Sequence, residues 1–138
     1  MELLAGFMAG TLMALIFVGH MAIVVVYHPP SFLSRWAERE PSRGFVPIAV
    51  TMVTGAMLFW PAVGVGAALL FSRAQERFPT DVPAVPSAVY LAIIVGFALV
   101  SAPLPSVLLW RLRRHLLLEY AVFLSIFGLM VPWIAGAE

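Results

Sequence analysis

Four long apolar stretches dominate this chain of 138 residues and constrain its fold more than any other feature. They cover residues 3–27, 45–71, 86–110 and 116–134, and each is close to or longer than the ~20 residues that a helix needs to cross a ~30 Å hydrocarbon layer. Hydrophobic residues make up 62% of the chain, which is more apolar surface than a soluble core of this size can bury. The sequence therefore predicts an all-α, polytopic membrane protein whose residues 1–138 form a single transmembrane bundle of four helices.

The distribution of arginine predicts the orientation of this bundle. Six of the eight arginines lie in the first and third connections, and the second connection holds the other two. Because positively charged connections tend to stay in the cytoplasm, we expect both termini on the outer side of a bacterial cytoplasmic membrane. The net charge of +1 argues against nucleic-acid binding, and a sequence without cysteine excludes disulfides and thiolate chemistry.

The first connection predicts a short helix of its own. Pro29 and Pro30 end the first apolar helix, and Ser31 can cap a new one by accepting hydrogen bonds from free N–H groups. From Ser31 onward, apolar and charged side chains fall on opposite helical faces, which favours a helix in the headgroup plane over the alternative, a solvated charged loop. Tryptophan prefers that depth, and the predicted interfacial anchors are Trp36, Trp110 and Trp133.

Prolines predict irregularities inside two of the apolar stretches. Pro61 removes a hydrogen bond in the middle of the second stretch, so we expect a kink there. Pro103 and Pro105 cannot both sit inside one regular helix, which predicts a break in the third stretch. Unwound backbone at membrane depth needs protein or water to satisfy it, so this break should face the bundle interior or a cavity. The second connection, residues 72–85, is polar and rich in proline and is expected to be a tether.

Small residues predict where helices approach one another closely. Gly6, Gly10 and Ala14 recur every four residues along the first stretch and form a smooth stripe on one helical face. Gly64 and Gly66 make the outer half of the second stretch similarly small. We expect the stripe to pack inside the bundle rather than against another chain.

One set of polar residues resembles a binding site. His20 lies inside the first stretch, ~10 Å from its cytoplasmic end at 1.5 Å per residue, and Glu119 lies one turn into the fourth. Ionisable side chains are costly at that depth, which makes both of them candidate functional residues, although a hydrogen bond from His20 to a neighbouring helix is the simpler explanation. His115 can pair with Glu119, since the two are four residues apart. The residues expected to gather in the cytoplasmic half of the bundle are His20, Ser101, Ser106, Arg111, Arg114, His115 and Glu119. Such a cluster could bind a lipid phosphate or a quinone headgroup, relay protons, or pin two helices together.

No run of residues spells a catalytic or cofactor motif, so the architecture must carry the functional interpretation. Because so little of the chain is predicted outside the membrane, the leading interpretation is an accessory or structural subunit of a larger membrane complex, or a homo-oligomer. The alternative is a lipid- or quinone-headgroup-binding protein or a small transporter. A second alternative is a haem-bearing membrane anchor with His20 as the ligand. No catalytic residue, metal site or other cofactor is predicted. The expected partners are membrane lipid, other membrane subunits or a second copy of the chain, and not nucleic acid.

Overall fold

The computed structural model describes residues 2–27, 31–39, 46–82, 84–101 and 116–136, and most of these residues are helical. The helices in chain order are α1 (Glu2–Tyr27), α2 (Ser31–Arg39), α3 (Val46–Arg77), α4 (Ala88–Ser101) and a last helix in three consecutive parts, α6 (Leu116–Phe123), the π-helical η2 (Leu124–Met130) and α7 (Val131–Ala135). No strand occurs in these ranges. The predicted all-α class is therefore confirmed.

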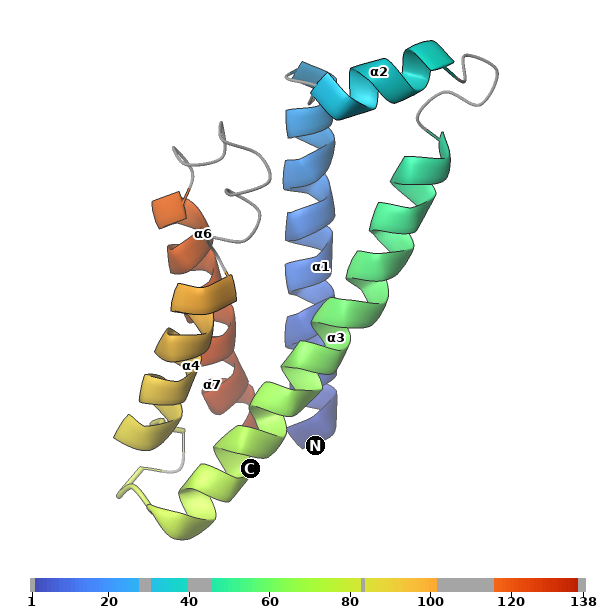
Figure 1. Ribbon diagram of the computed structural model, residues 1–138. Helices are drawn as coiled ribbons and strands as arrows, with labels where there is room; N and C mark the ends of the chain where they lie inside the picture. Colours follow the sequence, from blue (N-terminus) through green and yellow to red (C-terminus); the bar gives the residue numbers. More distant parts are fainter. Residues whose placement is uncertain (1, 28–30, 40–45, 83, 102–115, 137–138) are drawn as a thin grey trace.

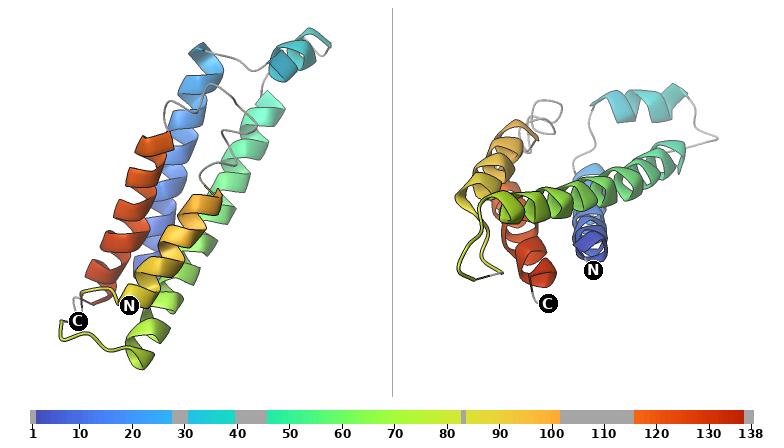
Figure 2. Two further views of the ribbon diagram at one scale, coloured as in Figure 1. Left: turned by 60° about the vertical axis from the view of Figure 1, so that its left-hand side comes forward. Right: turned by 90° about the horizontal axis from the view of Figure 1, so that it is seen from below.

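The long helices run side by side, and α2 lies across one end of them (Figure 1). Both ends of the chain lie at the opposite end of the molecule, and α3 crosses α1 diagonally (Figures 1 and 2). The short helix predicted to begin at Ser31 is present, and its charged side chains Arg35, Glu38 and Arg39 are exposed. Its position in a headgroup plane stays a prediction.

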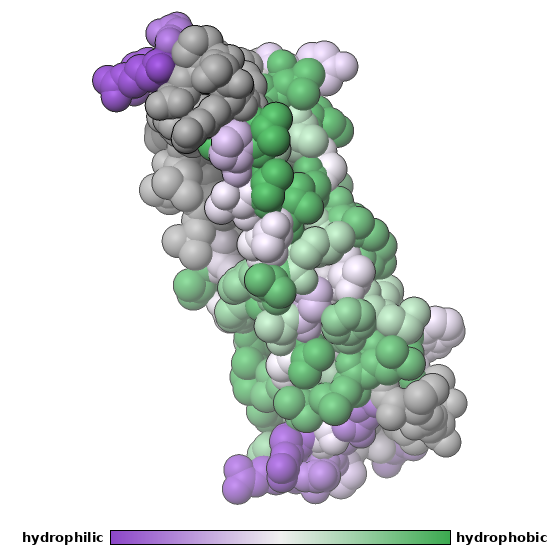
Figure 3. All heavy atoms as spheres, turned by 90° about the vertical axis from the view of Figure 1, so that its right-hand side faces the viewer, coloured by the Kyte–Doolittle hydropathy of each residue, from purple (hydrophilic) through white to green (hydrophobic). Residues whose placement is uncertain are grey.

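Three helices are long and apolar enough to cross a bilayer, as judged by length and composition: Glu2–Tyr27, Val46–Arg77 and Leu116–Ala135. The fourth, α4, is apolar along its 14 residues but shorter than a full crossing. On the face drawn in Figure 3, hydrophobic residues cover the middle of the molecule and hydrophilic residues gather at its two ends. The predicted break at Pro103 and Pro105 lies outside the described residues.

Helix α3 is longer than its apolar stretch, which corrects one predicted boundary. The connection was expected to begin at Ser72, but the helix continues to Arg77. Ala74 is buried, and Arg73 pairs with Glu76 one turn later at 3.6 Å, so this polar end is stabilised as helix. Pro61 lies inside α3, which the structure describes as one unbroken helix, and the predicted kink there stays a prediction.

The connection after α3 is ordered by its own hydrogen bonds. The Gln75 side chain donates to Thr80 Oγ1 at 3.0 Å and to the Val85 carbonyl at 3.1 Å, and Thr80 Oγ1 donates to the same carbonyl at 2.9 Å. Ser87 then caps α4 by accepting from the backbone N–H of Tyr90 at 3.3 Å. The expected tether is thus a compact turn that sets where α4 begins.

The π-helical segment η2 was not predicted, and its hydrogen bonds explain how it is maintained. Its register is one residue wider than that of an α-helix, and the backbone N–H of Val131 accordingly donates to the Ile126 carbonyl. The next residue, Pro132, has no N–H, so the Phe127 carbonyl has no donor in that register. The hydroxyl of Tyr90, a fully buried residue of α4, donates to this carbonyl instead. One side chain therefore both satisfies the wide turn and ties α4 to the last helix.

The core begins where α1 and α3 cross, at positions without side chains. A Cβ atom on Gly64 would overlap the carbonyl oxygen of Gly6, and one on Gly10 would overlap the carbonyl oxygen of Trp60. The two backbones are therefore in direct contact, as in close helix pairs with small residues at the interface. Ala14, the third member of the stripe, is also fully buried.

Aromatic rings fill the core next to this crossing. The Trp60 ring contacts Phe17 of α1 with a centroid distance of 5.8 Å. It also contacts two rings of the last helix, Phe123 and Phe127, each at 6.2 Å. Such pairs add packing energy beyond their buried area, and here one ring joins three helices.

Candidate functional site

Two ionisable side chains from different helices meet beside the aromatic core. His20 projects from α1, seven residues before the helix ends at Tyr27, and its Nε2 lies 3.7 Å from Oε1 of Glu119 on α6. Both side chains are largely covered, with 25% and 21% of their surface exposed. The other residues of α1 from Leu3 onward, and the other residues of α6, include no Asp, Glu, Lys, Arg or His. A pair in such surroundings interacts more strongly than it would in water.

A hydroxyl from a third helix completes this group. Ser101, the last described residue of α4, lines the same space as His20 and Glu119. Its Oγ is buried, and no described atom lies within hydrogen-bond distance of it. Buried hydroxyls usually have a hydrogen-bond partner, so a hydroxyl in this position can bind a polar group that enters the space. We call His20, Ser101 and Glu119 the polar triad.

The polar triad borders a small, partly open cavity between four helices. Its volume is about 90 Å³, space for roughly three waters at ~30 Å³ each. Its other walls are apolar: Met13, Ile16, Phe17, Trp60, Leu118, Val122 and Phe123. The aromatic core forms its floor, because Trp60 and Phe123 belong to both.

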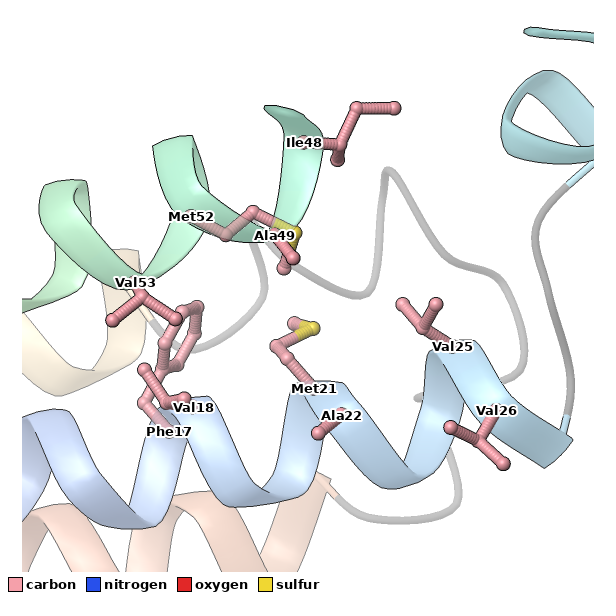
Figure 4. Close-up of a pocket in the computed structure, with 10 residues that line it drawn as sticks. All are labelled: Phe17, Val18, Met21, Ala22, Val25, Val26, Ile48, Ala49, Met52 and Val53. Carbon is pink, nitrogen blue, oxygen red and sulfur yellow. The ribbon is translucent and has the colours of Figure 1, made fainter. Parts of the chain in front are cut away.

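A larger apolar cavity opens between α1 and α3 on the side of the molecule that carries α2. The two helices touch at Gly6, Gly10 and Gly64 and diverge from there, so a wedge of about 430 Å³ remains between them. Figure 4 shows Met21 of α1 pointing across the gap towards Ala49 and Met52 of α3. The described residues that line it are all hydrophobic: Phe17, Val18, Met21, Ala22, Val25, Val26, Ile48, Ala49, Met52 and Val53. We call this cavity the wedge.

Phe17 lies on the boundary between the two spaces. It lines both the wedge and the cavity of the polar triad, and it is only half-buried. Its ring contacts that of Trp60. Figure 4 shows Phe17 among the residues that line the wedge. Phe17 is therefore the described residue that the two linings share.

The structure brings three of the predicted cluster residues together and leaves the rest outside its described part. His20, Ser101 and Glu119 line one cavity. Glu119 faces His20 across the helix interface. Its other predicted partner, His115, lies outside the described residues. The other predicted residues outside the described ranges are Ser106, Trp110, Arg111 and Arg114, together with the side chain of Trp36.

The predicted packing glycines and the predicted anchor Trp133 are in different environments in the structure. Gly6, Gly10 and Gly64 are in backbone contact, whereas Gly66 faces open space, with nothing within 4 Å of a Cβ built there. Trp133 is on the surface, 68% exposed.

Sequence reasoning overlooked Phe17 and Trp60 as residues that border the candidate site. A Trp directly before a mid-helix Pro was the available signal, and this turn of α3 lies against Gly10 of α1.

The side chains of the polar triad can bind a polar group. One carboxylate, one imidazole and one hydroxyl can accept and donate hydrogen bonds to a polar group that enters the cavity. Hydrolytic or transfer chemistry needs a nucleophile with its base, or several ligands that converge on a metal ion. The described residues contain no group of three or more His, Cys, Asp or Glu with such spacing.

No protein-family model, curated protein or solved structure matches this chain.

Proposed function

We propose that this protein is a four-helix integral membrane protein that binds the polar head of a lipid-soluble molecule, a lipid or a quinone, at the polar triad. The observation that carries this proposal is the His20–Glu119 pair, 3.7 Å apart in otherwise apolar helices and beside a cavity. Ionisable residues at such a depth are costly to bury and are kept where they serve a ligand, an ion path or each other. The adjoining buried hydroxyl of Ser101 favours the ligand.

The apolar surface supports the membrane part of the proposal. Large hydrophobic side chains point outward along every long helix, for example Val26 at 73%, Leu58 at 70% and Leu117 at 84% exposure. A water-soluble monomer rarely presents so much contiguous apolar surface. A bilayer covers it, and the described part of α4 then needs residues beyond Ser101 to complete the fourth crossing.

The packing of α1 favours ligand binding over the role of accessory subunit. A small-residue stripe can seat a helix of another chain, but here Gly6, Gly10 and Ala14 are all buried within this chain. A haem anchor is less favoured as well, because the 90 Å³ cavity beside His20 is far smaller than a tetrapyrrole. Membrane assembly through other faces remains compatible with ligand binding.

Detergent-free extraction tests the proposal. The protein is released from membranes in styrene–maleic acid particles, and co-extracted lipids and quinones are quantified per protein by mass spectrometry. We expect one species to be enriched over the bulk membrane in a roughly one-to-one ratio. Glu119→Gln and His20→Ala should each reduce this enrichment without loss of the folded protein.

Glu76→Gln is the matched control for the loss of a carboxylate. Glu76 is 65% exposed at the far end of α3, where it pairs with Arg73, so its variant should retain the wild-type enrichment. Lipid content that equals the bulk composition, or that is unchanged in both triad variants, contradicts the proposal.

A further inference from the structure

We infer that the ligand is a single-chain amphiphile with an uncharged head that carries a hydroxyl or carbonyl group, and that its chain lies in the wedge. This inference rests on the proposed function, because it assigns the head to the polar triad. It adds the chemical class of the ligand and a second part of the site, between α1 and α3.

The volume of the wedge sets the number of chains. Its 430 Å³ corresponds to about 14 groups of water or methylene size at ~30 Å³ each. That is the space of one alkyl or isoprenoid chain of moderate length. Two acyl chains of a membrane phospholipid need more than twice this space.

The lining of both spaces selects the charge of the head. Among the described residues that border the wedge and the triad cavity there is no Lys or Arg. A phosphate or a free carboxylate would therefore face Glu119 without a counter-charge from these walls. An ammonium group would compete with His20 for the one carboxylate. A hydroxyl or carbonyl needs no counter-charge, since Glu119 can accept a hydrogen bond and Ser101 can donate one.

Phe17 is where the chain and the head of such a ligand would join. It borders both spaces, and it is the one described residue that the two linings share. A side chain that is only half-buried can change rotamer to let a chain pass. The Trp60 ring, whose centroid is 5.8 Å from that of Phe17, would then lie beside the ligand and report its presence.

Fluorescence of Trp60 gives a direct assay of binding. The variant with Trp36, Trp110 and Trp133 replaced by Phe retains Trp60 as its single tryptophan. It is placed in phosphatidylcholine nanodiscs, because maltoside detergents belong to the proposed ligand class. A decyl benzoquinone should quench Trp60 saturably with one site per chain, and monooleoylglycerol should reverse the quenching. Oleate, oleylamine and dioleoyl phosphatidylglycerol should reverse it at least about tenfold less well.

Matched substitutions on α3 test the location of the chain. Ala49→Phe fills the wedge and should weaken binding at least about tenfold, because each excluded methylene lowers the affinity about fourfold. Ala62→Phe adds the same side chain at an exposed position outside the wedge and should leave binding unchanged. Met52→Ala enlarges the wedge and should shift the preferred quinone to a longer alkyl chain, a gain that misfolding cannot produce.

The possible failures are distinct. Equal competition by phosphatidylglycerol, or equal binding by the Ala49→Phe and Ala62→Phe variants, overturns the assignment of the wedge and the single chain. If Glu119→Gln still weakens binding in that case, the proposed function stands and only this inference fails. If Glu119→Gln has no effect and no probe quenches Trp60 saturably, the proposed function fails with it.

Discussion

Gly6 and Gly64 determine how closely α1 and α3 can approach, because each occupies the space that a Cβ of the other would need. The sequence indicated small faces on both helices but could not choose between Gly64 and Gly66. Two residues apart on a helix, these glycines point to nearly opposite sides, so only one can face α1. The choice depends on the rotation of α3, which the whole bundle sets.

The two glycines of α3 should therefore respond in opposite ways to alanine. Gly64→Ala forces backbone against backbone and should destabilise the protein by about 1–3 kcal/mol or more. Gly66→Ala adds a methyl group in open space and should be neutral or stabilising by up to ~1 kcal/mol, because alanine is the better helix former. Thermal or denaturant unfolding in one detergent measures both. Equal destabilisation would show that the crossing lies elsewhere.

Tyr90 is the residue whose single polar atom matters most to the packing. Its hydroxyl bonds the Phe127 carbonyl in the core, and its ring packs edge-on against Phe71 at a centroid distance of 5.4 Å. Tyr90→Phe keeps the ring but leaves a buried carbonyl without a donor, which should cost about 1–3 kcal/mol. Tyr27→Phe, at a position that is 73% exposed, is the control and should change the unfolding free energy little. A neutral Tyr90→Phe variant would contradict the bond.

At the scale of elements, the helices were easier to predict than their internal register. Long apolar stretches and the proline pair after Tyr27 located α1 and α2, because hydrophobic length and missing N–H groups act locally. The π-helical segment depends on a tyrosine 37 residues away in the sequence, and no local pattern contains it. The extension of α3 to Arg77 was overlooked for a related reason, since polar residues that favour helix resemble a loop when only hydropathy is considered.

The π-helical register should depend on Pro132 and Tyr90 together. Pro132→Ala restores an N–H that can bond the Phe127 carbonyl, so the hydroxyl of Tyr90 is no longer its only available donor. Tyr90→Phe should then cost less in the Pro132→Ala background than in the wild type. The expected coupling is about 0.5–3 kcal/mol in a double-mutant cycle. Strict additivity of the two changes in unfolding free energy would contradict this account of η2.

At the scale of the whole molecule, the candidate site depends on how the helices cross, and this could not be predicted from the sequence. Hydropathy predicted that His20 and Glu119 lie at similar depth, and depth alone was enough to group them with Ser101. The wedge was not predictable, because it forms where two straight helices diverge from a glycine contact on one side. Which residues line it follows from the crossing, and the crossing follows from the choice of Gly64.

The account depends above all on the helices crossing a bilayer with the polar triad inside it, and single-cysteine labelling measures this directly. The sequence has no cysteine, so Glu38→Cys in α2, Asp81→Cys after α3 and Ser125→Cys in η2 each introduce one thiol, at exposed positions. In intact cells, a membrane-impermeant maleimide should label the Asp81 variant at once, the Glu38 variant after permeabilisation, and the Ser125 variant in neither case. Labelling of the Ser125 variant as fast as the others in native membranes, or of Glu38 and Asp81 variants from the same side, would contradict the account.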